Sequence, residues 1–157
     1  MPEHSVYSNI KSFLEGNGIA FRSVHHEPTR TSEESAKARG EDISVGGKAI
    51  LMKVDDVFNL FVISAAKRID SQKIKTYFNA KKLRFANAEE LFQLTGLVPG
   101  SVPPFGEPIL PFALYVDTSI QRNTRIAFNA GSLTDSIVMP TEDYFRIAQA
   151  EVFEFAG

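Results

Sequence analysis

The stretch TGLVPGSVPPFG, residues 95–106, places three glycines and three prolines among apolar side chains and constrains the fold more than any other segment. Proline fixes φ and glycine permits backbone conformations that other residues avoid, so this loop is stiff and lets bare backbone approach a ligand. Its apolar members, Leu97, Val98, Val102 and Phe105, argue against a solvated linker. The loop is therefore either one wall of a small-molecule pocket or a proline-rich structural crossover.

A second segment, GGKAILMK at residues 46–53, brings Lys48 into an apolar strand directly behind two glycines. Lysine is rarely buried without a partner. Lys48 either extends its charged end along the surface from a strand end, or it binds the carbonyl or terminal phosphate of an ester substrate.

A third segment, FNAGSLT at residues 128–134, follows the loop by about twenty residues. Two interpretations are open, because Asn-Ala-Gly at a strand end is also an ordinary turn. In the functional one, polar groups of this segment bind the amine or the terminal ribose of a substrate. The candidates are Asn129, Gly131, Ser132 and Thr134.

These three segments, in this order, resemble the YbaK/ProX family of free-standing aminoacyl-tRNA deacylases, which is related to the editing domain of bacterial prolyl-tRNA synthetases. The resemblance spans roughly residues 19–155, and its most specific part is the VPPFG sequence of the loop. It implies an α+β fold in which a curved, barrel-like, mixed or antiparallel sheet is flanked by helices. It also implies that Lys48 is the family's functional lysine, although Ala49 stands where a threonine is common.

The loop would supply both catalytic donors and a size filter. Hydrogen-bond donors aimed at a developing oxyanion stabilise ester hydrolysis, and the candidate backbone N–H groups belong to Gly100, Ser101 and Gly106. The side chains expected to line a small cavity are Val102, Pro103, Pro104 and Phe105. A small cavity excludes large side chains by overlap, so we expect alanine-, serine- or cysteine-sized groups to be preferred over phenylalanine or leucine.

Other catalytic arrangements are absent from the sequence. It contains no cysteine, no Gly-x-Ser-x-Gly motif and no Walker-type phosphate loop, and His4, His25 and His26 lack the spacing of a zinc motif. No metal or cofactor is expected. An aminoacyl ester is already activated, so positioning and carbonyl polarisation suffice; the resemblance implies that the neighbouring ribose hydroxyl of the substrate assists the attacking water.

Length and composition predict one domain, residues 1–157, with a conventional core that includes 13 phenylalanines. The first thirteen residues lack the apolar run of a signal peptide, and no segment approaches the length of a membrane span. These absences predict a cytoplasmic protein.

The net charge of −2 argues against indiscriminate DNA binding but hides a basic cluster in residues 67–84, where Asp70 is the only acid. This cluster is either a solvated surface or a patch that contacts tRNA phosphates. Its members are Lys67, Arg68, Lys73, Lys75, Lys81, Lys82 and Arg84.

Periodicity and capping signals predict helices and strands in mixed order, which favours an α+β domain with a mixed or antiparallel sheet. Thr31 with Glu34, and Asn87 with Glu90, fit capping boxes. Helices are expected at residues 5–17, 31–40, 70–79, 87–96 and from 141 onward. Strands are expected at residues 19–25, 45–54, 57–64, 83–86, 112–116, 125–129, 133–139 and 152–155.

The resulting hypothesis is a trans-acting editing enzyme that hydrolyses the ester of a tRNA mischarged with a small amino acid, with tRNA-Pro as one candidate carrier. The acceptor end of the tRNA and an aminoacyl-tRNA synthetase are the expected partners. Two alternatives remain at this point: a non-catalytic module that binds tRNA or a small ligand, and a protein-interaction domain that has kept the fold without the chemistry.

Overall fold

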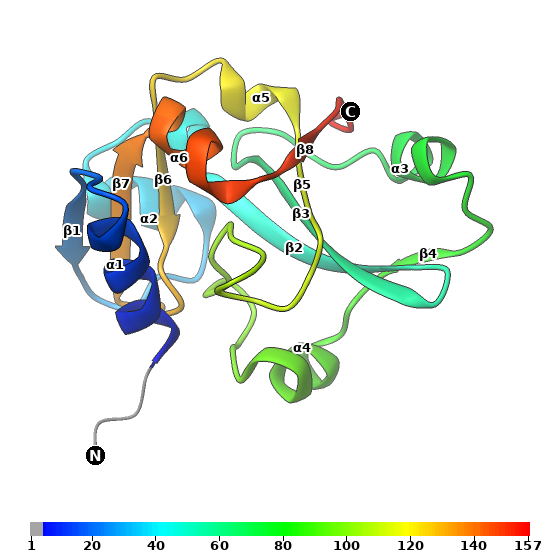
Figure 1. The fold of residues 1–157 in the computed structure, drawn as a ribbon, viewed down its shortest axis with the longest axis horizontal. Coiled ribbons are helices and arrows are strands. Elements are labelled where there is room, and N and C mark those ends of the chain that lie inside the picture. The colour runs from blue at the N-terminus through cyan, green and yellow to red at the C-terminus, as the bar shows by residue number, and fades with distance from the viewer. Residues whose placement is uncertain (1–4) are drawn as a thin grey trace.

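The computed structural model describes residues 5–157, which form two β-sheets with helices packed around them (Figure 1). The helices are α1 (Val6–Gly16), α2 (Ser32–Arg39), the 3-10 helix η1 (Ile43–Val45), α3 (Ser71–Phe78), α4 (Ala88–Thr95), α5 (Thr118–Gln121) and α6 (Thr141–Ala148). The strands are β1 (Arg22–His25), β2 (Gly47–Val54), β3 (Val57–Ser64), β4 (Leu83–Phe85), β5 (Leu114–Val116), β6 (Arg125–Asn129), β7 (Asp135–Pro140) and β8 (Glu151–Val152).

One sheet is antiparallel and the other is mixed, both within the prediction, but they do not close into one barrel. The smaller sheet has the antiparallel order β1-β7-β6, and the larger has the order β4-β2-β3-β5-β8, in which β5 runs parallel to both neighbours. A bridge between Gly46 and Ala127 joins the two sheets. The α+β class is therefore confirmed, whereas the barrel-like sheet becomes two sheets that meet at the start of β2.

The β2–β3 hairpin positions Lys48, the lysine singled out by the sequence. The two strands pair from Gly47 with Ser64 to Val54 with Val57, and Asp55 makes the tight turn with a positive φ of 53°. In Figure 1 this hairpin extends from the small sheet toward β4 and α3. Lys48 thus lies at the end of the hairpin nearest the small sheet, far from the turn.

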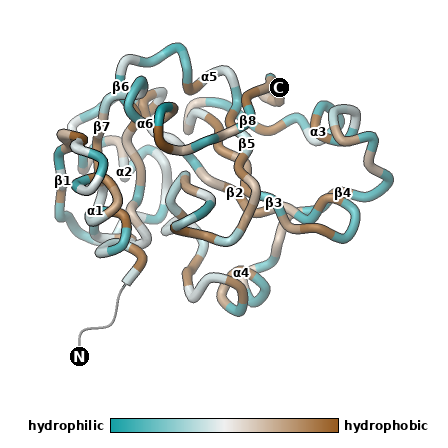
Figure 2. The backbone as a smooth tube through the Cα atoms, viewed as in Figure 1, coloured by the Kyte–Doolittle hydropathy of each residue, from teal (hydrophilic) through white to brown (hydrophobic). Residues whose placement is uncertain are grey.

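The core explains why the loop at residues 95–106 is apolar. Leu97, Val102 and Phe105 are buried in the larger of two apolar clusters, together with residues of β2, β3 and β6. Figure 2 shows apolar residues gathered along β2, β3 and β5, while several of the outer turns are hydrophilic. The loop is therefore anchored by its side chains, which leaves selected backbone groups at the surface.

The capping signals correctly located two helices. Thr31 accepts a hydrogen bond from the Glu34 N–H (3.1 Å), although the Glu34 carboxylate accepts from Arg30 rather than completing the predicted box. Asn87 and Glu90 form the full capping box. The four-residue helix α5 was not predicted, because it is too short to show a periodicity. Within residues 5–157 we find no helix with the length and apolar character needed to span a membrane.

Candidate functional site

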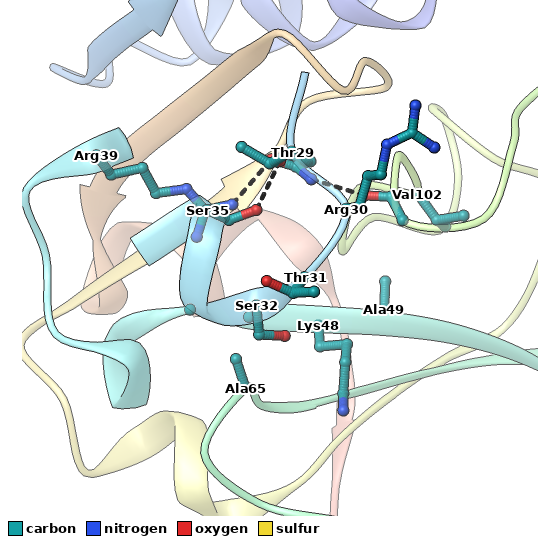
Figure 3. Close-up of a pocket in the computed structure, with 14 residues that line it drawn as sticks. Thr29, Arg30, Thr31, Ser32, Ser35, Arg39, Lys48, Ala49, Ala65 and Val102 are labelled. Carbon is teal, nitrogen blue, oxygen red and sulfur yellow. Dashed lines mark hydrogen bonds between the residues drawn. The ribbon is translucent and has the colours of Figure 1, made fainter. Parts of the chain in front are cut away.

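A cavity of about 180 Å³ lies where the two sheets meet, between the start of α2, the start of β2, the glycine–proline loop and the end of β6 (Figure 3). We call it the polar pocket. Its lining residues are Thr29, Arg30, Thr31, Ser32, Ser35, Arg39, Gly46, Gly47, Lys48, Ala49, Ala65, Gly100, Val102 and Asn129. Lys48, Gly100, Val102 and Asn129 were predicted as site residues from three separate segments, and the fold brings these four together.

Lys48 is half-buried at the beginning of β2. None of the five ion pairs among residues 5–157 includes its ammonium group. In Figure 3 its Nζ atom lies away from Arg39, at the opposite side of the polar pocket. A cation in this position can interact with an oxygen of a ligand that enters the pocket.

Close packing favours glycine at the two positions before Lys48, apart from any role that these residues have beside a ligand. A Cβ on Gly47 would lie 2.7 Å from Ile126 Cδ1, and one on Gly46 would lie 3.1 Å from Ala65 Cβ. These residues therefore permit β2 to cross closely over β6, and this crossing creates one end of the pocket.

Of the three loop residues predicted to supply backbone donors, one lines the polar pocket. Gly100 lines it with a φ of 89°, a conformation that favours glycine. Ser101 is buried and its N–H donates to the Val98 carbonyl (3.1 Å). Gly106 lies beneath the Phe112 carbonyl oxygen, which a Cβ would strike. Ser101 and Gly106 thus stabilise the loop, and neither lines the pocket.

The predicted size filter also needs correction. Phe105 is 1% exposed, and its ring packs edge-to-face against Phe13, Phe128 and Tyr144. Pro103 and Pro104 are buried as well, and neither lines the polar pocket. Periodicity could not distinguish a loop side chain that faces a ligand from one that faces the core. Val102 alone of these four side chains reaches the cavity.

Asn129 connects β6 to the loop. Its Nδ2 donates to the Gly100 carbonyl (2.7 Å), while its Oδ1 accepts hydrogen bonds from Arg39 Nη2 (3.0 Å) and Ser136 Oγ (3.1 Å). These bonds fix both the amide orientation and the position of Gly100.

The other three residues predicted in this segment, Gly131, Ser132 and Thr134, lie outside the polar pocket. Gly131 adopts a φ of 76°, and a Cβ there would lie 2.7 Å from Val6 Cγ1 on α1. The Thr134 hydroxyl donates to Asp135 (3.1 Å), as does that of Ser132 (2.9 Å). For Gly131 and Thr134 the structure therefore favours the turn interpretation.

Arg39 is a site residue that the sequence analysis missed. It is 8% exposed, its Nε donates to Ser136 Oγ (2.9 Å), and burial lowers the pKa of its guanidinium to about 10. Glu41 raises that pKa, but its carboxylate is already bound by Arg22 and Arg125. Arg39 is thus a charged, buried side chain outside the ion pairs of residues 5–157, and it lines the pocket.

Hydroxyl groups form the rest of the polar lining. Thr29 and Ser35 are buried, and their hydroxyl oxygens lie 2.8 Å apart (Figure 3). Thr31 and Ser32 complete this wall at the start of α2. A signal was present in the sequence, since residues 29–32 read TRTS, but it was interpreted only as a helix start.

The histidines take part in no metal site that the structure describes. His4 lies outside the described residues, and His25 bonds to Asp135 (2.8 Å). His26 is half-buried, with Nε2 2.9 Å from Ser136 Oγ. Within residues 5–157, no three His, Asp or Glu side chains gather in a way that would hold a metal ion.

The basic cluster is spread along the hairpin rather than gathered at the pocket. Lys67 and Arg68 follow Ala65, a pocket residue, and are exposed. Lys73 and Lys75 lie on α3, where Lys73 Nζ donates to the Ala156 carbonyl (2.8 Å).

The far end of the cluster lies at the hairpin turn. The exposed Lys81 and Lys82 have backbone N–H groups that donate to Asp55. Arg84 forms a two-bond pair with Glu90 (2.8 and 2.7 Å), so it contributes little net charge. Without Arg84, the basic cluster therefore extends from Lys67 and Arg68, which lie near the polar pocket, to Lys81 and Lys82 at the turn of the β2–β3 hairpin.

Comparisons with known proteins agree on one family. A family model described as "Aminoacyl-tRNA editing domain" matches residues 26–147. The "Multifunctional Ser/Thr-tRNA deacylase ProXp-y" of Escherichia coli K12 is 32% identical over 155 residues, covering 95% of this chain and 92% of that protein.

Two further similarities concern prolyl-tRNA synthesis. The proline–tRNA ligase of Shouchella clausii is 36% identical over 101 residues, which are 64% of this chain and 18% of the ligase. A solved structure described as a putative trans-editing enzyme for prolyl tRNA synthetase superposes with a TM-score of 0.84, with 24% identity and 97% coverage of both chains. At that identity the superposition establishes the shared fold.

Proposed function

The chain belongs to the aminoacyl-tRNA editing domain family, and from this premise we propose that it is a trans-editing deacylase that removes serine and threonine from mischarged tRNA. The choice of serine and threonine rests on the residues that line the polar pocket. Hydroxyl groups, the Asn129 amide and the buried Arg39 guanidinium surround a cavity of about 180 Å³. That volume suits a small side chain, and that lining suits one with a hydroxyl.

In such a site, a hydrogen bond to a substrate hydroxyl discriminates between amino acids more strongly than the size of the cavity does. A missing methylene costs a ligand only ~1–3 kcal/mol, whereas a site built to bind a hydroxyl rejects an analogue that lacks it much more strongly. Alanine in the polar pocket would offer no oxygen to the N–H groups of the buried Arg39 that are not already bonded to Ser136 and Asn129. The pocket therefore favours serine and threonine over alanine, which refines the preference for small groups expected from the sequence.

The reaction follows from the positions of Lys48 and Gly100. Water attacks the ester carbonyl carbon, the bond between that carbon and the ribose oxygen breaks, and the ribose oxygen takes a proton as the free amino acid leaves. Lys48 and Gly100 both line the polar pocket, and in this proposal the Lys48 ammonium and the Gly100 N–H stabilise negative charge on the carbonyl oxygen. The adjacent ribose hydroxyl of the substrate directs the water, so no protein base is required.

The tRNA carrier is the second part of the proposal. Similarity to proline–tRNA ligases over part of their length supports tRNA-Pro as one carrier and a prolyl-tRNA synthetase as a partner. The basic cluster extends along the β2–β3 hairpin, in which the six residue steps from Lys48 to Val54 span about 20 Å at about 3.3 Å per residue. That length allows the acceptor stem to rest on Lys81 and Lys82 while its aminoacylated end reaches Lys48.

A panel of charged tRNAs tests this function directly. Seryl, threonyl, alanyl and leucyl esters on tRNA-Pro and on a second tRNA are incubated with the purified protein, and kcat/KM is measured for each. We expect seryl and threonyl esters to be hydrolysed fastest and the leucyl ester to be excluded. Binding of these tRNAs without hydrolysis of any of them would instead identify a non-catalytic module.

Arg39→Met is expected to lower the ratio of seryl to alanyl kcat/KM by about 10- to 100-fold, because hydrogen bonds to charged groups contribute about 1.5–3 kcal/mol. Arg39→Lys should restore part of the ratio. Arg146→Met is the matched control, since Arg146 is an exposed arginine paired with Asp143 on α6. Thermal unfolding of each variant confirms that the fold is retained. If the folded Arg39→Met protein keeps the wild-type ratio of seryl to alanyl kcat/KM, Arg39 does not contribute to selection of the amino-acid side chain.

The basic cluster predicts a salt-dependent affinity for tRNA. Neutralising Lys81 and Lys82 to glutamine should reduce the slope of log Kd against log salt concentration by about 1–2, since each phosphate contact contributes roughly one unit. Lys11→Gln on α1 is the control. Equal slopes for the double variant and the wild type would identify these lysines as an ordinary solvated surface.

A further inference from the structure

A second cavity adjoins the polar pocket and has the opposite chemical character. Its volume is about 220 Å³, and it lies between β2, the end of β4 and the start of α4. It shares Lys48, Ala49, Gly100 and Val102 with the polar pocket. We call it the apolar groove. The two cavities are therefore the two arms of one cleft, and Lys48 and Gly100 lie where the arms join.

The walls of the apolar groove suit a flat, uncharged ring. Leu51 of β2 forms one side, and Leu91 of α4 and Pro99 of the loop contribute to the others. Lys48, at the junction, is the only charged residue in the described lining. A phosphate would find no second cation there, whereas an aromatic heterocycle would be desolvated against aliphatic surface.

Phe85 gives this groove an exposed aromatic face. Its side chain lines the groove and is 54% exposed, although phenylalanine normally lies in the core. It occupies the three-residue strand β4 at the edge of the larger sheet, opposite Met52. In residues 5–157, it is outside all the aromatic ring pairs that stabilise the core. An aromatic ring held at the mouth of a groove is a platform on which a nucleobase can stack.

Asn87 supplies a polar edge to the same groove. Its Oδ1 accepts the Glu90 N–H (2.8 Å) as part of the helix cap. The capping box thus holds this side chain in place, with an amide NH₂ that can donate to a ring nitrogen. The groove therefore offers both a stacking surface and a fixed amide.

We propose that the apolar groove binds the base of the substrate's terminal adenosine, with the adenine stacked on Phe85. This inference rests on the proposed function, because an ester held at Lys48 and Gly100 has an amino acid on one side and a nucleoside on the other. The polar pocket suits the small amino acid, so the apolar groove receives the nucleoside. Phe85 thereby orients the ester through the adenine, a part of the substrate that does not react.

Two non-hydrolysable analogues test the assignment, namely 3′-deoxy-3′-(serylamino)adenosine and its cytidine counterpart. Their Kd values are measured by titration calorimetry with the wild type, Phe85→Ala and Phe85→Tyr. We expect the wild type to prefer the adenosine analogue, Phe85→Ala to bind it about tenfold more weakly, and Phe85→Tyr to retain most of the affinity. Phe92→Ala is the matched control, because Phe92 is 60% exposed on α4 and does not line the groove.

The outcomes separate this inference from the proposed function. If wild type and Phe85→Ala bind the adenosine analogue equally, the stacking platform is refuted while deacylation stands. If Phe85→Ala instead changes the preference between seryl and leucyl esters, the groove holds the amino acid and the assignment of the two arms is reversed. Failure of the wild type to bind either analogue, together with no hydrolysis of any charged tRNA, would overturn both proposals.

Discussion

Lys48→Ala is expected to lower kcat/KM for hydrolysis of the seryl ester by about 10²–10³-fold, the range found when one group that stabilises an oxyanion is removed. Lys48 is the one lysine among the residues that line both arms of the cleft in residues 5–157, and its charge is outside the ion pairs of those residues. The loss should fall mainly on kcat, because charge on the carbonyl oxygen develops in the transition state.

The stability of the Lys48→Ala protein should change little, because the side chain is half-buried and holds no structural ion pair. Lys53→Ala is the matched control, since Lys53 is a half-buried lysine on the same strand, with Nζ 5.7 Å from the centre of the Phe58 ring. Single-turnover rates and thermal unfolding are measured for both variants. Full activity in Lys48→Ala, or an equal loss in Lys53→Ala, would remove Lys48 from the chemistry.

Phe105→Ala is expected to lower the free energy of unfolding by about 3–5 kcal/mol, the usual cost of truncating a buried phenylalanine. The ring lies against Phe13, Phe128 and Tyr144 at centroid distances of 6.0, 5.5 and 5.4 Å. The Tyr144 hydroxyl donates to the Pro104 carbonyl (2.6 Å), so the cavity left by the substitution would also disturb the anchor of the loop.

Urea unfolding followed by far-UV circular dichroism measures this effect, with Phe92→Ala as the exposed control. Loss of activity should follow loss of folded protein, and the preference for small amino acids should not widen in the fraction that remains folded. A stable Phe105→Ala protein that accepts leucyl esters would restore the interpretation of Phe105 as a size filter, which the burial of its ring now opposes.

The three quoted segments indicate the family from sequence alone, and the family is confirmed. Local chemistry explains this success. Proline and glycine restrict the backbone wherever they occur, and caps such as Thr31 and Asn87 act on N–H groups three residues away. Features that depend on near neighbours in the chain can therefore be predicted from the chain alone.

Features that depend on which surfaces meet could not be predicted in this way. The side chains of Val102 and Phe105 lie three residues apart in one loop, yet one lines the cleft and the other is in the core. Arg39 gave no signal, because its importance comes from partners on β6 and β7 about ninety residues later.

The amino-acid sequence by itself determined the α+β class and the positions of most helices and strands, and it singled out a lysine and a loop that line one cavity. The tertiary structure decided which residues of that loop face the cleft, and it placed Arg39 and the hydroxyls of residues 29–35 in the same cavity. The physical reason is that capping and backbone restriction act over a few residues, whereas burial and the hydrogen bonds of Arg39 depend on strands that meet only after folding.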